Sequence, residues 1–298
     1  MKKLLALLLL VSVNAEAATL NSGAAFLKIG TGARPEAMGG AYTALADDVS
    51  ALHYNPAGLS SVLKKEAGIT HTEYLLGSKF DFVGYAHPTK LGTFGLGFVR
   101  LDTGNQEARD ANRQSVGGFS AADSAYTFGF SRRMRVVSLG ANIKFLESKI
   151  GSDSASTFAL DLGAVRQLGK FSLGLSVLNV GQGMKFISQR DPLPLAISMG
   201  GAYRLGGALN MALDVRHEPN DRRTDVGLGT EYAVLPMFSL RAGYATMGSI
   251  TSARGGSSPL NGLGGGFGLK LKNYKADYTF TPFGDLGNVQ RISLGVGF

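Results

Sequence analysis

The chain of 298 residues contains no cysteine. It can therefore hold no disulfide framework, no thiolate metal site and no cysteine nucleophile. Charged residues make up 17% of the sequence, below the roughly 25% that is usual in soluble domains. The composition excludes thiol chemistry and offers few charges for a surface in contact with water.

Long apolar runs and long charge runs are missing as well. No stretch approaches the ~18 consecutive apolar residues that a membrane-spanning helix needs. The net charge of +8 is scattered along the chain, which gives little support to nucleic-acid binding. If an exported chain of this composition lies in a membrane, it must cross the membrane with strands.

The motifs of common catalytic and metal sites are also absent. The four histidines show neither the HxxH nor the HExxH spacing, and no GxSxG or P-loop pattern occurs. The glycine-rich run 262–268 lacks the strand-then-helix context of a nucleotide loop and is better explained as the start of a strand. We therefore expect no enzyme, no metal site and no cofactor.

The N-terminus has the pattern of an export signal. Lys2 and Lys3 precede an apolar run from Leu4 to Val13, and Ala15-Glu16-Ala17 forms a small-x-small site. This pattern predicts a signal peptide over residues 1–17. The alternative is a single membrane anchor, for which the apolar run is short.

From about Glu66 onward, apolar and polar residues alternate with the period of a strand. Residues 137–145 show this clearly, because Val137, Leu139, Ala141, Ile143 and Phe145 alternate with polar or small residues. The alternation predicts an all-β fold, a transmembrane antiparallel barrel over residues 64–298 with about fourteen strands. The expected strands are 66–75, 80–89, 92–102, 124–134, 135–149, 154–168, 171–181, 194–205, 208–218, 224–234, 238–250, 263–273, 274–284 and 289–298.

The connections between these segments sort into two groups. Most of those on one side are long, such as 103–123 and 182–193, although 151–153 is also placed there; those on the other side are tight, such as Gly206-Gly207. Transmembrane barrels sort their loops in this way, whereas a soluble sandwich has no reason to do so. We expect both termini on the short-turn side, facing the periplasm.

The polar face of the expected strands carries the candidate lumen residues. They either line a permeation path or pair with one another and with residues that precede the barrel, because a narrow barrel fills its interior. These candidates are Asp214, Arg216, Glu231, Arg241, Lys270, Lys272, Lys275 and Asp277.

The last segment alternates and ends on Phe298. Such an ending resembles the closing strand of bacterial outer-membrane barrels, which their assembly machinery reads. Phe298 is therefore the candidate assembly signal. The alternative is the last strand of a soluble sheet, in which an aromatic end would be accidental.

Residues 18–63 differ from the barrel pattern and contain the candidate hatch or gating residues. Gly39-Gly40 allows a sharp bend or a close approach of two backbones. Asp47-Asp48 is an acid pair or calcium ligand set, or else a helix cap and a partner for lumenal cations. Asn55-Pro56-Ala57-Gly58 is a turn that acts as a hinge or is merely structural. Short helical turns are expected at 41–46 and 49–52.

The run from Phe26 to Val62 resembles the N-terminal signature of the PorV/PorQ family, which is related to FadL-type outer-membrane proteins. The matching pieces are FLKIG from Phe26, GAR from Gly32, MGGA from Met38, ADD from Ala46 and NPAGL from Asn55. The resemblance implies a segment that folds back into the lumen as a hatch, in a fourteen-stranded outer-membrane barrel. The chain is shorter than FadL transporters, and its outer loops are modest.

Three functions remain open from the sequence. The first is an accessory of protein export in a type IX-like secretion system, with secretion components or cargo as partners. The second is FadL-like, hatch-gated transport of small hydrophobic molecules across the outer membrane. The third is a soluble secreted β protein. For the first two, the other expected partners are outer-membrane lipid and the barrel assembly machinery.

Overall fold

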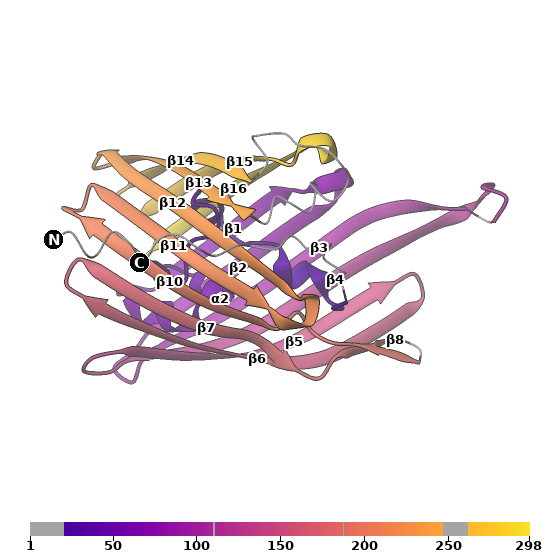
Figure 1. Ribbon diagram of the computed structural model, residues 1–298, viewed down its shortest axis with the longest axis horizontal. Coiled ribbons are helices and arrows are strands. Elements are labelled where there is room, and N and C mark those ends of the chain that lie inside the picture. The colour runs from indigo at the N-terminus through magenta and orange to yellow at the C-terminus, as the bar shows by residue number, and fades with distance from the viewer. Residues whose placement is uncertain (1–20, 110, 187, 247–261) are drawn as a thin grey trace.

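The computed structural model is a closed antiparallel β-barrel of fourteen strands with helical turns inside it (Figure 1). It describes residues 21–109, 111–186, 188–246 and 262–298. Consecutive barrel strands are neighbours, and β1 pairs with β16 to close the ring, Glu66 lying opposite Gly297. A separate hairpin, formed by β8 (Met184–Phe186) and β9 (Gln189–Asp191), lies between β7 and β10. The prediction of a fourteen-stranded barrel is confirmed.

The barrel strands have the following bounds: β1 Glu66–Glu73, β2 Lys79–Pro88, β3 Thr93–Arg109, β4 Ser115–Arg133, β5 Ser138–Ile150, β6 Asp153–Leu168, β7 Phe171–Gly181, β10 Ala196–Leu205, β11 Leu209–Glu218, β12 Arg223–Leu235, β13 Phe238–Ala245, β14 Leu263–Leu271, β15 Tyr274–Pro282 and β16 Asn288–Gly297. Short 3-10 helices at η3 (Leu75–Gly77), η4 (Pro219–Asp221) and η7 (Gly284–Leu286) join strands on one rim.

Apolar side chains face outward from the barrel. Phe128, Leu139, Leu213 and Ile292 are 40–53% exposed, although a soluble sheet would bury such residues in a core. The inward positions are polar or small, and many are fully buried. The barrel is therefore apolar outside and polar inside, and the soluble-sandwich alternative is wrong.

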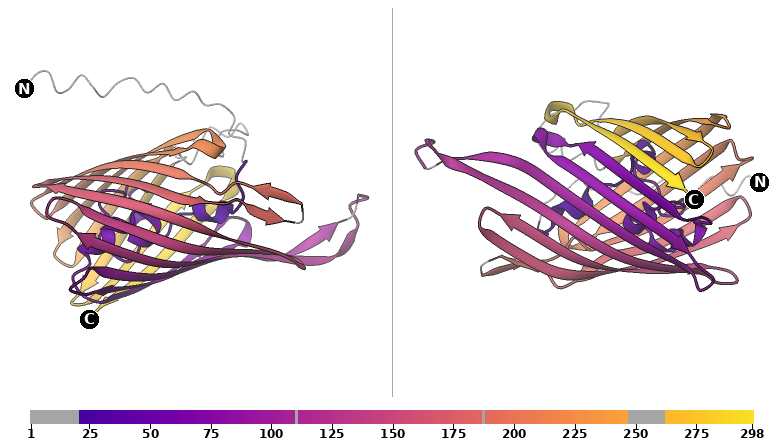
Figure 2. Two further views of the ribbon diagram at one scale, coloured as in Figure 1. Left: turned by 90° about the horizontal axis from the view of Figure 1, so that it is seen from below. Right: turned by 180° about the vertical axis from the view of Figure 1, so that it is seen from behind.

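The connections divide the barrel into two rims. The short-turn rim carries the turns β2–β3, β4–β5, β6–β7, β10–β11, β12–β13 and β14–β15, together with Phe298; the long-loop rim carries the others. Two expectations about the long-loop rim differ from the structure. Residues 151–152 form a tight turn, and most of 103–123 is strand, because β3 and β4 project far beyond the barrel as a hairpin (Figures 1 and 2). Small residues hide the alternation there. Between residues 115 and 125, the only large apolar side chains are Val116 and Phe119.

Residues 21–63, which we call the lumen segment, fill the barrel. They form η1 (Ala25–Lys28), α1 (Ala33–Ala37), α2 (Ala51–Tyr54) and η2 (Pro56–Ser61). Phe26, Met38, Tyr42, Leu45 and Leu59 are almost completely buried and make up much of the apolar core. The core therefore lies inside the ring of strands and is built from residues that precede it.

The local expectations for this segment were only partly met. Residues 41–46 form turns and no regular helix, the second helix lies two residues later than expected, and α1 was not expected. The helix α1 was hidden because it has only five residues, with Pro35 at its centre. None of the described helices is long and apolar enough to cross a membrane.

The lumen segment runs through the whole height of the barrel. Its first described residues are bound at the long-loop rim, where the Gly23 amide donates to the Pro192 carbonyl over 2.9 Å. The segment leaves at the short-turn rim, where β1 begins at Glu66. The expectation that both termini lie at the short-turn rim is therefore wrong for the described N-terminal residues. The expected signal peptide lies outside the described residues.

Candidate functional site

A cluster of charges joins the lumen segment to the barrel wall. The Arg34 guanidinium donates to both carboxylate oxygens of Glu231, at 2.8 and 3.0 Å, and to Asp47 at 2.5 Å. Arg241 donates to the same Glu231, at 2.7 Å, and to Asp277, also at 2.7 Å. We call these five residues the clasp. Four of them are candidates from the sequence, and the clasp places hatch and lumen candidates in one network.

The second acid of the Asp47-Asp48 pair belongs to the same region. The Asp48 carboxylate accepts from the Tyr42 hydroxyl at 3.0 Å and from the backbone amide of Ser50 at 2.9 Å. Ser50 is the residue before α2, so Asp48 stabilises the approach to this helix. Lys275, another lumen candidate, binds Glu66 at 2.8 Å beside the start of β1.

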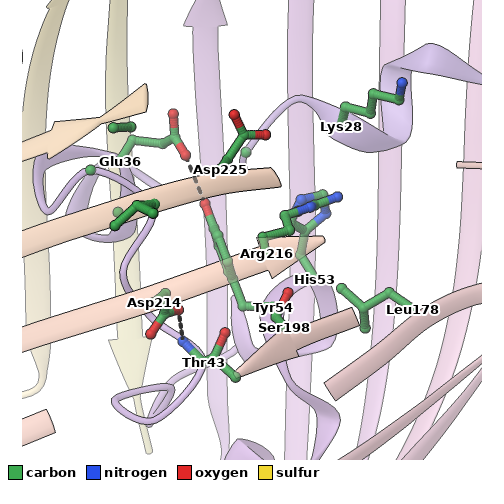
Figure 3. Close-up of a pocket in the computed structure, with 16 residues that line it drawn as sticks. Lys28, Glu36, Thr43, His53, Tyr54, Leu178, Ser198, Asp214, Arg216 and Asp225 are labelled. Carbon is green, nitrogen blue, oxygen red and sulfur yellow. Dashed lines mark hydrogen bonds between the residues drawn. The ribbon is translucent and has the colours of Figure 1, made fainter. Parts of the chain in front are cut away.

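Asp214 holds the backbone of the lumen segment at mid-height (Figure 3). Its carboxylate accepts from the amides of Tyr42 and Thr43, at 2.9 and 2.7 Å. The other Asp214 oxygen makes no hydrogen bond to a described residue and faces a cavity of about 50 Å³. Such a space holds a water molecule or two.

Arg216 and His53 lie on another side of this small cavity (Figure 3). Arg216 also binds Glu218 at 2.9 Å. The side chain of His53 is buried between the lumen segment and the wall.

The turn at Asn55 is fixed by three hydrogen bonds. The Asn55 side chain accepts from the Ala57 amide at 3.1 Å and donates to the carbonyls of Thr43 and Ala164, at 2.8 and 3.2 Å. Pro56 then opens η2. The turn is thus tied both to the lumen segment itself and to β6 of the wall.

Glycines let the lumen segment lie directly on the wall. A Cβ atom on Gly39 would lie 2.5 Å from the carbonyl oxygen of Tyr244 in the wall. Within the lumen segment itself, a Cβ on Gly58 would lie 2.5 Å from the Ala46 carbonyl oxygen. On the wall side, a Cβ on Gly140 would overlap the backbone of Pro56 and Ala57. Gly40 has open space around its α-carbon, but its φ of +72° favours glycine.

Three candidates lie at the short-turn rim. Lys270 and Lys272 are exposed there and do not reach the interior of the lumen, because β14 ends between them and the next turn begins. Phe298 donates its amide to the Lys65 carbonyl over 2.8 Å, and its ring lies 6.5 Å from that of Tyr85.

A larger cavity of about 340 Å³ lies between the lumen segment and the wall. Its apolar lining includes Phe26, Ile29, Leu101 and Phe283. Arg291 also lines it; this side chain is 2% exposed and binds Glu36 at 3.0 Å. The Nε and Nη1 atoms of Arg291 have no hydrogen-bond acceptor among the described residues. The cavity thus combines an apolar wall with unused donors.

The sequence reasoning missed several residues of this site, namely Lys28, Arg34, Glu36, Asp221 and Arg291. Lys28 and Arg34 lie in the run that carries the family resemblance, but neither was singled out. Arg291 occupies an inward position of the final strand, next to the outward-facing Ile292, so the alternation was sufficient to find it. Asp221 lies in a loop, where no periodicity applies. The described residues contain no group of three side chains suited to a metal ion.

Comparison with known proteins gives both sequence and structural matches. Residues 15–157 match an uncharacterised protein family, UPF0164. Over 254 residues the chain is 28% identical to a UPF0164 protein of Treponema pallidum (strain Nichols), a match that covers 77% of this chain. The chain spans 60% of the length of that relative.

The fold is that of known channels. The toluene transporter TbuX of Ralstonia pickettii superposes with a TM-score of 0.63 at 14% identity, over 90% of this chain and 98% of TbuX. The P. putida toluene transporter TodX gives 0.62 at 12% identity, over 90% and 99%. A Pseudomonas aeruginosa FadL homologue gives 0.57 at 11% identity, over 87% and 96%. The resemblance to PorV/PorQ proteins stays a prediction.

Proposed function

We propose that this protein is an outer-membrane channel for small hydrophobic molecules, with the lumen segment as its gate. The observation that carries the proposal is the cavity of about 340 Å³ between the lumen segment and the wall. This volume lies in the range of small-molecule sites, and its apolar lining suits an apolar ligand. The fold shared with hydrocarbon transporters supports this function.

The surface of the barrel supports the proposed location. An apolar outer face, short turns on one rim and long loops on the other are the features of barrels in the bacterial outer membrane. In that orientation the long-loop rim faces outward from the cell. The cavity lies toward that side, since Phe26, Tyr74 and Phe283 all lie near the long-loop rim.

Passage toward the short-turn rim requires the lumen segment to move. Below the cavity, the clasp and the backbone contacts of Asp214 hold the segment against β11, β12, β13 and β15. Buried ion pairs of this kind resist partial opening, because separating them leaves charges without partners. The clasp is therefore the proposed closed state of the gate.

A reversible disulfide tests the gate. A Cβ on Gly84 would lie 3.0 Å from the Cβ of Val49, so the pair Val49→Cys and Gly84→Cys reaches disulfide geometry after a small shift. The chain has no cysteine of its own, so no other thiol competes. In cells that carry this variant, we expect entry of the apolar fluorophore N-phenylnaphthylamine to stop under oxidising conditions and to return with reductant.

The two single-cysteine variants are the controls, because they change the same side chains without a lock. If the dye enters every strain no faster than it enters a strain without the protein, the proposal of a channel is wrong. If the dye enters equally fast with the disulfide closed, the proposal that the lumen segment is a gate is wrong, and the proposal of a channel still stands.

The export function remains the second candidate on the sequence resemblance alone. The residues that carry this resemblance are mostly buried against the wall, including Phe26, Met38 and Leu59. They therefore build the plug of the barrel and present no surface to a secreted cargo, which is why we place transport first.

A further inference from the structure

The short-turn rim carries an unusual set of cations. Ten lysines and arginines there are exposed, and none has an ion pair with a described acid. We call them the basic rim: Lys64, Lys65, Lys90, Arg132, Arg133, Arg135, Arg166, Lys170, Lys270 and Lys272.

The basic rim forms a continuous arc. Its residues lie at the turns β14–β15, β2–β3, β4–β5 and β6–β7 and at the entry to β1, which are successive positions around the closed ring. The arc stops at β10–β13, where the turns contain Gly206-Gly207 and Pro236-Met237. One sector of the rim is therefore neutral, and the cations are not spread evenly.

Acids are almost missing from the described part of this rim. The nearest ones, Glu66 and Asp47, are bound to Lys275 and Arg34. The long-loop rim differs, because it also carries acids and several of its cations pair with them, as Arg100 does with Asp102 and Arg223 with Asp225. The excess of positive charge is thus confined to one rim.

The arc lies just beyond an aromatic belt on the outer face. Phe94 and Phe130 have ring centroids 4.9 Å apart, and Phe171 and Tyr203 have centroids 4.6 Å apart, all near the short-turn ends of their strands. Aromatic belts mark the level at which hydrocarbon gives way to lipid headgroups. The cations therefore lie at headgroup level.

Two of the arginines point toward lipid by register. Arg132 pairs with Leu139 and Arg166 pairs with Leu173, and both leucines are exposed on the outer face. Directly paired residues of antiparallel strands share a face. Long arginine side chains at this depth extend to the interface and meet phosphate groups.

We propose that the basic rim binds the phosphate groups of anionic phospholipids in the membrane leaflet at the short-turn rim. The inference rests on the membrane location in the proposed function. An acidic protein partner fits the observations less well, because the cations follow the circumference of the ring and two of them, Arg132 and Arg166, have the outward register. Clusters of several lysines and arginines beside a membrane attract anionic headgroups strongly.

The test measures how strongly the purified full-length protein binds two lipids, and how substitutions at each rim change that binding. The rim variant carries Arg132→Gln, Arg166→Gln and Lys170→Gln. The matched control carries Lys79→Gln, Lys149→Gln and Lys185→Gln, which removes the same charge from exposed positions of the long-loop rim. Native mass spectrometry counts the phosphatidylglycerol and phosphatidylethanolamine molecules retained by each protein.

We expect wild type and control to retain phosphatidylglycerol about tenfold more strongly than phosphatidylethanolamine, and the rim variant to lose most of that preference. Equal retention of the two lipids by wild type, or an equal loss in the control, overturns the inference. Capture of an acidic periplasmic protein by the rim, without lipid preference, also overturns it. Failure of the wild type to insert into bilayers of either lipid counts instead against the membrane location.

Discussion

At the scale of single residues, glycine decides how closely the lumen segment approaches the wall. Gly140 in β5 and Gly201 in β10 lie in the same ring of strands but meet different surroundings. A Cβ on Gly140 would overlap the backbone of Pro56 and Ala57, whereas one on Gly201 has nothing within 4 Å. Alanine at Gly140 therefore reports on the contact with the lumen segment, whereas alanine at Gly201 reports only on the intrinsic cost of glycine in a strand.

We expect Gly140→Ala to destabilise the folded barrel by about 1–3 kcal/mol, because backbone atoms cannot yield as a flexible side chain does. Gly201→Ala is expected to be neutral or slightly stabilising, since alanine loses less chain entropy on folding. The measurement is the urea dependence of unfolding in detergent, followed by the heat-resistant band on a gel. Equal effects of the two substitutions contradict a tight contact at Gly140.

At the scale of elements, the first described stretch of chain is held by one carboxylate. Asp221 in η4 accepts from the Ser22 hydroxyl at 2.8 Å and from Lys28 at 2.6 Å. Burial alone would raise the pKa of Asp221, but the hydrogen bonds from Lys28 and Ser22 and the charge of Lys28 lower it below its usual value of 3.8. A carboxylate with a lowered pKa stabilises the folded state above the unfolded pKa and stops doing so as the pH falls through the folded pKa.

This sign gives a pH prediction for the anchor of the lumen segment. A spin label on Ala25→Cys is expected to have the same restricted mobility at about pH 7 and about pH 5, and to become mobile only below the usual carboxylate range. With Asp221→Asn added, the label is expected to be mobile at every pH. Asp153→Asn, an exposed acid on the same rim, is the control. Mobility that rises between pH 7 and pH 5 contradicts the assignment to Asp221.

At the scale of the whole molecule, closure depends on the last strand. Phe298 donates to Lys65 and stacks near Tyr85, so it covers the join between β16, β1 and β2. We expect deletion of Phe298 to lower the amount of assembled barrel in the outer membrane several-fold, because the closing strand loses its terminal contacts and its predicted assembly signal. Phe158→Ala is the control, since Phe158 is exposed to a similar extent, 63% against 59%. The heat-resistant band in isolated membranes measures the yield, and equal yields reject the role of Phe298.

The barrel could be predicted from the sequence because alternation along a strand records which face is apolar. Val137–Phe145 shows that pattern over a full strand, and the same pattern placed Glu231, Arg241 and Asp277 on the inner face. The alternation holds no information about which residues of the lumen segment meet that face. Arg34 reaches Glu231 across 197 positions of sequence, so the clasp is visible only after the chain has folded back.

The hairpin of β3 and β4 was missed for a related reason. Alternation identifies a strand only where large residues mark one face, and the projecting part contains mostly small or polar ones. Residues 105–108 and 117–120 pair only with each other, so no second neighbour imposes a pattern on them.

The path of residues 21–63 has a consequence for biogenesis. The ring of strands encircles residues 21–63, whose first residues are bound at the long-loop rim and whose last residues lead into β1 at the short-turn rim. Either residues 21–63 are in place when β16 joins β1, or the whole segment must be drawn through the closed ring afterwards, past Glu231, Arg241 and Asp277, the three clasp residues of the wall. Closure of the ring and placement of residues 21–63 inside it are therefore coupled steps of biogenesis.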